Sequence, residues 1–135
     1  MPTIVVDVAN VMGSRPDGWW RDRAGAAVRL HAEIARLAAS GRAILSGEPG
    51  PAAFVLVLEG AARAAAARME PGEERPGEVR VVQARGSGDD AIVAVVRESP
   101  GRRVVVTADR ELRDRCVAAG AEILGPGWLL GLLRD

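Results

Sequence analysis

Residues 3–10 read Thr-Ile-Val-Val-Asp-Val-Ala-Asn. The run over residues 3–6 is predominantly apolar, Asp7 follows it directly, and Asn10 comes three residues later. An apolar run without alternating polar residues is typical of a strand that is covered on both faces, as in a parallel sheet. Asp7 has apolar neighbours on both sides, where an unpaired carboxylate is costly. The stretch therefore predicts a buried strand with one acidic side chain at its carboxyl end.

Four more short apolar runs follow the first, and most are rich in valine or isoleucine. The five predicted strands are 3–6, 54–58, 79–82, 103–106 and 121–124. The predicted helices are 21–39, 61–69, 89–98, 109–119 and 127–133. Because strands and helices alternate, we expect an α/β fold: a three-layer sandwich around a five-stranded parallel sheet. Segments 46–51 and 70–78 are rich in turn-forming residues and are predicted loops.

The length and composition limit the classes of protein that the chain can represent. Its 135 residues suit one domain over residues 1–135, and 48% hydrophobic residues are enough to fill a core. Eighteen basic residues balance 18 acidic ones, so no excess of positive charge attracts nucleic acid from a distance. All the basic residues are arginine, which excludes mechanisms that need a lysine, such as Schiff-base chemistry or a phosphate-binding loop lysine.

The same sequence indicates a reducing compartment. Cys116 is the only cysteine, so no disulfide forms within the chain. The N-terminal segment lacks the pattern of a signal peptide, and no apolar run approaches the roughly 20 residues of a membrane span. We therefore expect a cytoplasmic protein that does not enter a membrane. A homodimer is compatible with the fold class, and no residue identifies a protein partner.

Acidic residues follow four of the five predicted strands: Asp7, Glu59, the pair Asp89 and Asp90, and Asp109. Ligands of open parallel sheets bind beyond the carboxyl ends of the strands, so these acids should meet at one edge. Carboxylates this close repel one another unless a cation lies between them, and Mg²⁺ and Mn²⁺ prefer oxygen ligands. Such a site can orient a phosphodiester and activate water. The alternative for the three aspartates after residue 88 is helix capping.

Three short motifs, in order along residues 3–124, resemble the NYN branch of the PIN-like nucleases. Residues 7–10 (Asp-Val-Ala-Asn) resemble the Asp-Gly-x-Asn motif of that family, and 88–90 (Gly-Asp-Asp) resemble its central acidic motif. Residues 107–112 (Thr-Ala-Asp-Arg-Glu-Leu) are similar to its Thr-x-Asp-x-x-Leu signature. The resemblance implies a Rossmann-like sheet in the order 3-2-1-4-5. It also implies hydrolysis of single-stranded RNA with Mg²⁺ or Mn²⁺.

The resemblance also assigns roles by motif position. Asp7, Asp90 and Asp109 would be the catalytic metal ligands, directly or through water. Asp89 and Glu59 would be further acids of the metal site. Asn10 and Thr107 would support these acids or contact the substrate.

The segment that follows Asn10 should overhang this site. Residues 14–23 (Ser-Arg-Pro-Asp-Gly-Trp-Trp-Arg-Asp-Arg) hold two tryptophans among arginines, a combination that stacks bases and holds phosphates in single-strand binders. Trp19 and Arg15 are therefore candidate substrate contacts, as is Arg110 beside Asp109. The alternative is that a tryptophan fastens the first long helix to the core.

Val8 stands where the family has glycine, and a β-branched residue resists unusual backbone angles and close approach by a phosphate. A catalytically degenerate module of the same fold, binding RNA or a protein, is therefore one alternative to a ribonuclease. A nucleotide pyrophosphohydrolase is another, since it also needs clustered acids and Mg²⁺. The chain lacks the glutamate-rich helical motifs of that chemistry.

Overall fold

A five-stranded parallel sheet forms the centre of the computed structural model, which describes residues 1–134; residue 135 of the predicted domain lies outside this part. The strands are β1 (Thr3–Asp7), β2 (Ala53–Leu58), β3 (Val79–Gln83), β4 (Arg103–Val106) and β5 (Glu122–Leu124). Every neighbouring pair is parallel, and the order is β3-β2-β1-β4-β5. The predicted α/β class and strand order are thus confirmed. The order reverses at β1 and β4.

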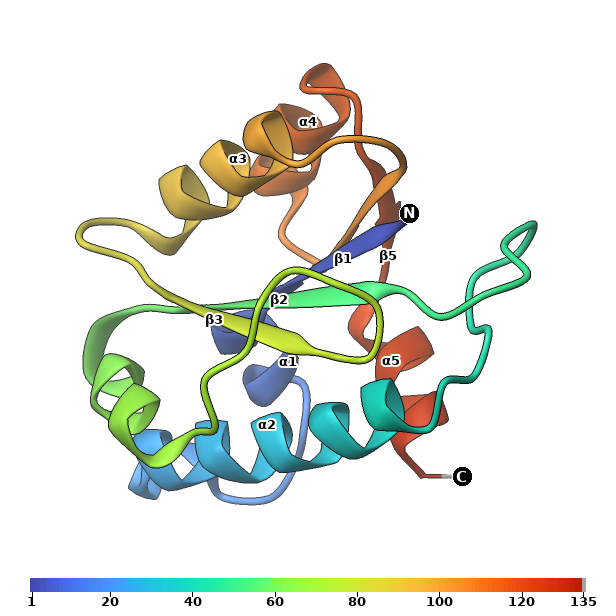
Figure 1. The fold of residues 1–135 in the computed structure, drawn as a ribbon. Coiled ribbons are helices and arrows are strands. Elements are labelled where there is room, and N and C mark those ends of the chain that lie inside the picture. The colour runs from blue at the N-terminus through green and yellow to red at the C-terminus, as the bar shows by residue number, and fades with distance from the viewer. Residues whose placement is uncertain (135) are drawn as a thin grey trace.

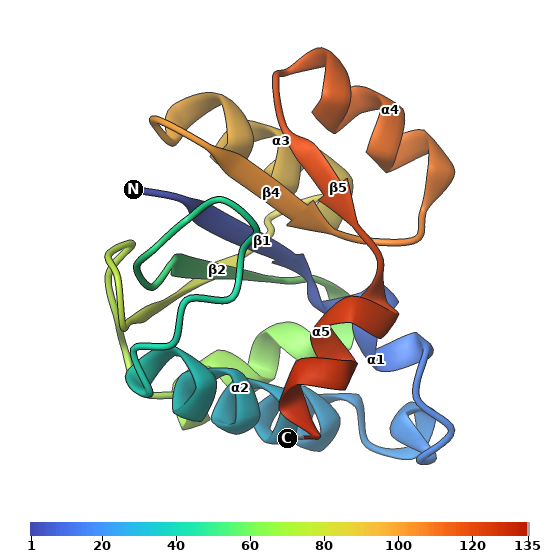
Figure 2. The same cartoon turned by 90° about the vertical axis from the view of Figure 1, so that its right-hand side faces the viewer.

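Helices cover both faces of the sheet. They are α1 (Val8–Gly13), α2 (Arg23–Ala39), α3 (Gly88–Glu98), α4 (Arg110–Ala118) and α5 (Pro126–Leu133), with 3-10 helices η1 (Trp19–Arg21) and η2 (Gly60–Arg68). Figures 1 and 2 show α3 and α4 on one face and α1, α2 and α5 on the other. This is the expected three-layer arrangement. Within residues 1–134, no helix combines the length and the apolar character that a membrane span needs.

The central strands are buried on both faces, as their continuous apolar runs predicted. In β1, Ile4 and Val6 belong to the core beneath α2, whereas Val5 belongs to the core beneath α3 and α4. A shift of register by one residue would exchange these faces, so the packing fixes how the strands align. In the observed register Asp7 lies opposite Val57, close to the carboxyl end of β2.

Three elements differ from the prediction. The 3-10 helix η1 was not expected before the first long helix. α1 was not expected, although Val8, Val11 and Met12 are its buried residues and have helical spacing. The helix predicted for 61–69 is instead the 3-10 helix η2. Its buried residues Ala62 and Ala65 lie three apart, which matches three residues per turn. Segments 46–51 and 70–78 contain no helix or strand, as predicted.

Candidate functional site

Four acidic side chains gather at the edge formed by the carboxyl ends of β1, β2 and β4. They are Asp7 at the end of β1, Glu59 after β2, Asp89 in the first turn of α3 and Asp109 after β4, hereafter the acidic cluster. Burial raises the pKa of Asp7 and of Asp89; the negative charges of Asp89 and Glu59 add to the rise at Asp7, and those of Asp109 and Glu59 add to the rise at Asp89. Asp89 is therefore within electrostatic reach of the other three carboxylates.

Asp7 is the most perturbed member of the acidic cluster. It is 7% exposed and caps α1, because its Oδ1 accepts a hydrogen bond from the Asn10 backbone N–H at 3.3 Å. Its Oδ2 accepts from the Thr107 hydroxyl at 2.9 Å. Burial raises the pKa of Asp7 to about 6; the two hydrogen bonds oppose this rise and the neighbouring acids add to it. A cation beside this carboxylate would favour its ionised form.

Thr107 and Asn10 hold the ends of β1 and β4 together. The Thr107 hydroxyl, which donates to Asp7, also accepts from the Asp109 backbone N–H at 3.1 Å. The Asn10 Oδ1 accepts from the Ala108 backbone N–H at 2.8 Å. Thr107 was predicted to contact the substrate. It is 1% exposed, so its hydroxyl is committed to these bonds and is not presented to a substrate. Both residues therefore position the acids.

Replacing Thr107 by valine should test this positioning role. The variant keeps the shape of the side chain but leaves the buried Asp7 Oδ2 without its donor, which should lower the free energy of unfolding by about 1–3 kcal/mol. Because the lost bond lowers the pKa of Asp7, that pKa should rise further. Urea unfolding and NMR titration of Asp7 measure the two effects. Thr107→Ser keeps the hydroxyl and should stay near wild type; a valine variant with wild-type stability and pKa would contradict the role.

Glu59 is held by the first turn of α3. Its Oε2 accepts a hydrogen bond from the Gly88 backbone N–H at 2.6 Å. The first N–H groups of a helix have no partner within it and favour negative charge nearby. A Cβ on Gly88 would lie 2.6 Å from the same oxygen, so glycine permits this close approach. This is the physical reason for glycine at the start of the 88–90 motif.

Asp89 and Asp90 face different surroundings, although they are adjacent. Asp90 accepts a hydrogen bond from Arg115 at 2.8 Å, its side chain is 74% exposed, and that bond holds its pKa below the usual value. The Asp90 backbone N–H donates to Ser87, the N-cap of α3. The pKa of Asp89 is instead raised, first by burial and then by the charges of Asp109 and Glu59. The structure therefore brings Asp89 to the acidic cluster and turns Asp90 toward α4, the reverse of the predicted ranking.

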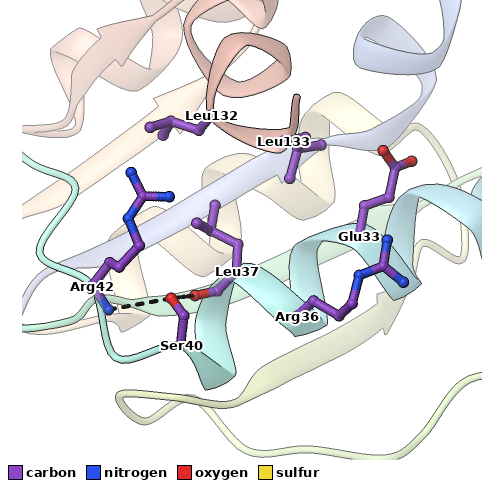
Figure 3. A pocket seen from close by; sticks show the side chains of 7 residues that line it. All are labelled: Glu33, Arg36, Leu37, Ser40, Arg42, Leu132 and Leu133. Atoms are coloured by element: carbon purple, nitrogen blue, oxygen red, sulfur yellow. Dashed lines mark hydrogen bonds between the residues drawn. The ribbon is translucent and has the colours of Figure 1, made fainter. Parts of the chain in front are cut away.

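Arg15 and Arg110 were predicted to contact the substrate. Among residues 1–134, neither forms a salt bridge with a member of the acidic cluster. Arg15 donates two hydrogen bonds to Glu33, at 2.8 and 2.9 Å, and these raise the pKa of Arg15. Glu33 lies on α2 and lines a cavity of about 270 Å³ between α2 and α5 (Figure 3). The other residues around that cavity are Arg36, Leu37, Ser40, Arg42, Leu132 and Leu133. Arg15 thus ties its segment to α2, and Arg110 is exposed at the start of α4.

A second open cavity, of about 340 Å³, adjoins the acidic cluster and is hereafter the edge cavity. Its lining residues are Ala9, Met12, Trp19, Arg23, Glu59, Gly60, Ala62 and Gly86. Glu59 belongs to both the cavity and the cluster. Trp19 is half-buried and also packs on the core, whereas Trp20 is 55% exposed and does not line the cavity. The residues come from separate segments of the chain, so no single stretch of sequence predicted the cavity.

Val8 does not obstruct the site. It is the first residue of α1 and is fully buried in the core beneath α2. Across residues 1–134, positive φ angles occur only at glycines, so the backbone at position 8 does not require glycine. A side chain without exposed surface does not block a phosphate. The substitution of glycine by valine therefore gives no structural reason for a degenerate site.

The acidic cluster is open and does not form a complete ligand shell. Among residues 1–134, no three histidine, cysteine, aspartate or glutamate side chains are gathered closely enough to hold a metal ion by themselves. Four oxygens of the cluster nonetheless have no hydrogen bond in the described part of the chain: Oε1 of Glu59, Oδ2 of Asp109 and both carboxylate oxygens of Asp89. Further ligands would have to come from water or from a bound molecule.

No family model and no curated protein matches this chain. The chain is similar to two crystal structures of Rae1 (YacP) from Bacillus subtilis. For a tryptophan-to-leucine mutant of that protein the TM-score is 0.70 at 15% identity, covering 99% of this chain and 76% of that one. For the protein without that mutation the TM-score is 0.68 at 16% identity, covering 99% and 74%. The likeness concerns the fold alone, an α/β arrangement around a five-stranded parallel sheet in the order β3-β2-β1-β4-β5.

Proposed function

We propose that this protein is a metal-dependent ribonuclease that hydrolyses phosphodiester bonds in single-stranded RNA. The observation that carries the proposal is the convergence of Asp7, Glu59, Asp89 and Asp109 at one sheet edge, with the pKa of the buried Asp7 raised to about 6. This edge adjoins the point where the strand order reverses, the usual ligand site of open α/β sheets. The PIN-like fold and the three motifs agree with this function.

The donor set fits Mg²⁺ or Mn²⁺. All four members offer carboxylate oxygens, which these hard cations prefer over nitrogen or sulfur. The open arrangement is compatible with Mg²⁺ in particular, since that ion keeps several waters and binds through one or two carboxylates plus substrate phosphates. Asp7, Asp89 and Asp109 would hold the ion, in part through water, with Glu59 beside them. A bound ion supplies charge to the phosphate oxygens and lowers the pKa of water.

The chain's own residues orient this chemistry. Thr107 fixes one oxygen of Asp7 and the backbone of Asp109, so both carboxylates keep their relative position. Asp109 is held further by the Leu112 backbone N–H at 2.9 Å. A site that is preorganised in this way needs little rearrangement when a phosphodiester arrives. Asn10, bonded to the Ala108 backbone, closes the same edge from the side of α1.

Comparison of Asp89→Asn with Asp90→Asn tests the proposal at neighbouring positions. Asp89→Asn should lower Mg²⁺-dependent cleavage of a short single-stranded RNA by about 10- to 100-fold, the usual effect of disturbing a metal site. Asp90→Asn should stay within about twofold of wild type, because Asp90 is exposed and paired with Arg115. A gel assay with and without EDTA measures both. If Asp90→Asn were inactive and Asp89→Asn active, Asp90 would be the metal ligand instead of Asp89. If the wild-type protein left RNA intact with both Mg²⁺ and Mn²⁺, the nuclease function would be excluded.

A binding module with the same fold is the second candidate. The observation in its favour is the open acidic cluster, in which no three acids among residues 1–134 close around a point. Such a module would bind RNA without cutting it. Calorimetry with Mn²⁺ separates the two functions, since a module without a metal site should give no binding heat at millimolar Mn²⁺.

A further inference from the structure

We infer that the edge cavity holds one unpaired nucleobase of the RNA strand whose phosphodiester lies at the acidic cluster. This inference rests on the proposed function to the extent that the ligand is RNA, and it does not require that the RNA is cut. It assigns Trp19 as the residue that contacts the base. Trp20, its neighbour in the chain, does not line the edge cavity but contacts the Trp19 ring.

The position of the edge cavity links it to the acidic cluster. Glu59 lines the cavity, and its charge also raises the pKa of Asp7 and Asp89. Ala9 follows Asp7 by two residues along the chain. A nucleotide bound with its phosphate at the acids would therefore have its base beside this opening. The volume of about 340 Å³ lies at the lower end of the range for small-molecule sites, as expected for a base with part of its sugar.

The lining of the edge cavity suits a flat, largely uncharged ring. Met12, Ala9 and Ala62 provide apolar surface, and a Cβ added to Gly60 or Gly86 would meet no atom within 4 Å, so open space adjoins both glycines. Base–aromatic stacking is the common way in which proteins hold single-stranded bases. Trp19 is the one aromatic residue in the lining.

Trp19 is held in place before any ligand arrives. Its ring meets that of Trp20 edge to face, with centroids 6.0 Å apart and planes at 89°. The Arg23 guanidinium lies 5.3 Å from the Trp19 ring centroid, and no carboxylate among residues 1–134 forms a salt bridge with it. A free guanidinium beside an aromatic wall favours a base attached to a phosphate over an apolar side chain of a protein partner.

Binding of a short single-stranded RNA, labelled at one end, tests the inference in fluorescence anisotropy. The wild-type protein is titrated with the intact oligonucleotide and with a series that carries one abasic nucleotide at successive positions. Gel analysis confirms that each RNA stays uncut during the measurement. One abasic position should weaken binding by about 5- to 150-fold, the range of base–aromatic stacking, and the other positions should have little effect. This arm needs no protein variant, so it does not depend on a variant that folds.

Trp19→Leu should weaken binding of the intact RNA by a similar factor and remove the sensitivity to that abasic position. Trp128→Leu, on α5 and outside the lining of the edge cavity, is the matched control and should keep both the affinity and the sensitivity; thermal unfolding checks that both variants are folded. Equal effects of all abasic positions, or a Trp19→Leu variant that keeps the positional effect, would overturn the base site. RNA cleavage with no positional effect overturns only the base site, whereas absence of RNA binding by wild type overturns both proposals.

Discussion

Asp7→Asn and Asp109→Asn should each lower metal-dependent RNA cleavage by about 100-fold or more. A bound metal ion contributes several kcal/mol of transition-state stabilisation, and each loss of about 1.4 kcal/mol lowers the rate tenfold. Both side chains are helix N-caps, Asp7 of α1 and Asp109 of α4, and asparagine caps helices as well as aspartate does. The variants should therefore fold while losing the charge that anchors the ion. Single-turnover cleavage at saturating Mg²⁺ measures the loss.

The control for this pair is an acid of the same type outside the acidic cluster. Asp22 caps α2 through the Gly25 backbone N–H at 2.9 Å, so Asp22→Asn makes the same chemical change at a helix start. It should keep full cleavage activity. Circular dichroism and thermal unfolding show whether each variant is folded. Folded Asp7→Asn and Asp109→Asn proteins that cleave RNA at the wild-type rate would remove these acids from the reaction.

The contribution of Asp7 to the free energy of unfolding should fall as the pH rises from about 4 to above 6, because the pKa of Asp7 is about 6 in the folded protein and 3.8 is its ordinary value. Between these values the folded state keeps the Asp7 proton that the unfolded state has lost, so each step up in pH favours unfolding. The complete shift corresponds to about 3 kcal/mol, at about 1.4 kcal/mol per pKa unit. Urea unfolding at a series of pH values measures this dependence.

Asp7→Asn isolates the contribution of Asp7 from those of other acids. The pKa of Asp89 is also raised, whereas those of Asp90 and Glu122 are lowered by their arginine partners, so the wild-type profile contains opposing effects. The difference between wild type and the variant should be largest above pH 6, where the variant should be the more stable protein. Millimolar Mn²⁺ should reduce that difference by stabilising ionised Asp7. Parallel pH profiles for the two proteins would show that Asp7 titrates normally.

The centre of the sheet was predictable from the sequence because β1, β2 and nearly all of β4 are buried. After their first residues, Thr3 and Arg103, the runs at 3–6 and 103–106 contain no polar residue, and the structure extends the first run by a single residue, Asp7. Helix α1 was missed because six residues are too few to show a helical period, although Asp7 before it is a common N-cap. The alanine-rich segment was given the wrong helix type, since propensity does not report how a segment packs.

The candidate site was predictable only in part. Strand ends located the acids, but the choice between Asp89 and Asp90 depends on the rotation of α3. A signal was present: Asp89 precedes the buried Ile92 and Val93 by three and four residues, which puts it on the inward side of the helix. The bond from Thr107 to Asp7 joins residues 100 apart in the sequence, and the edge cavity is built from several elements, so neither has a local signature.

The direct passage from β1 into α1, with Asp7 as the last residue of one and the cap of the other, limits where the chain tolerates insertions. An added residue there would turn this carboxylate to the opposite side of the sheet, since neighbouring strand residues alternate between faces. The connection between β3 and α3 spans residues 84–87, and its end is tied to the acids by the hydrogen bond from the Gly88 backbone N–H to Glu59, so it leaves more slack. Divergent copies and designed variants should therefore acquire new loops at that connection, while the length of the 3–10 stretch stays constant.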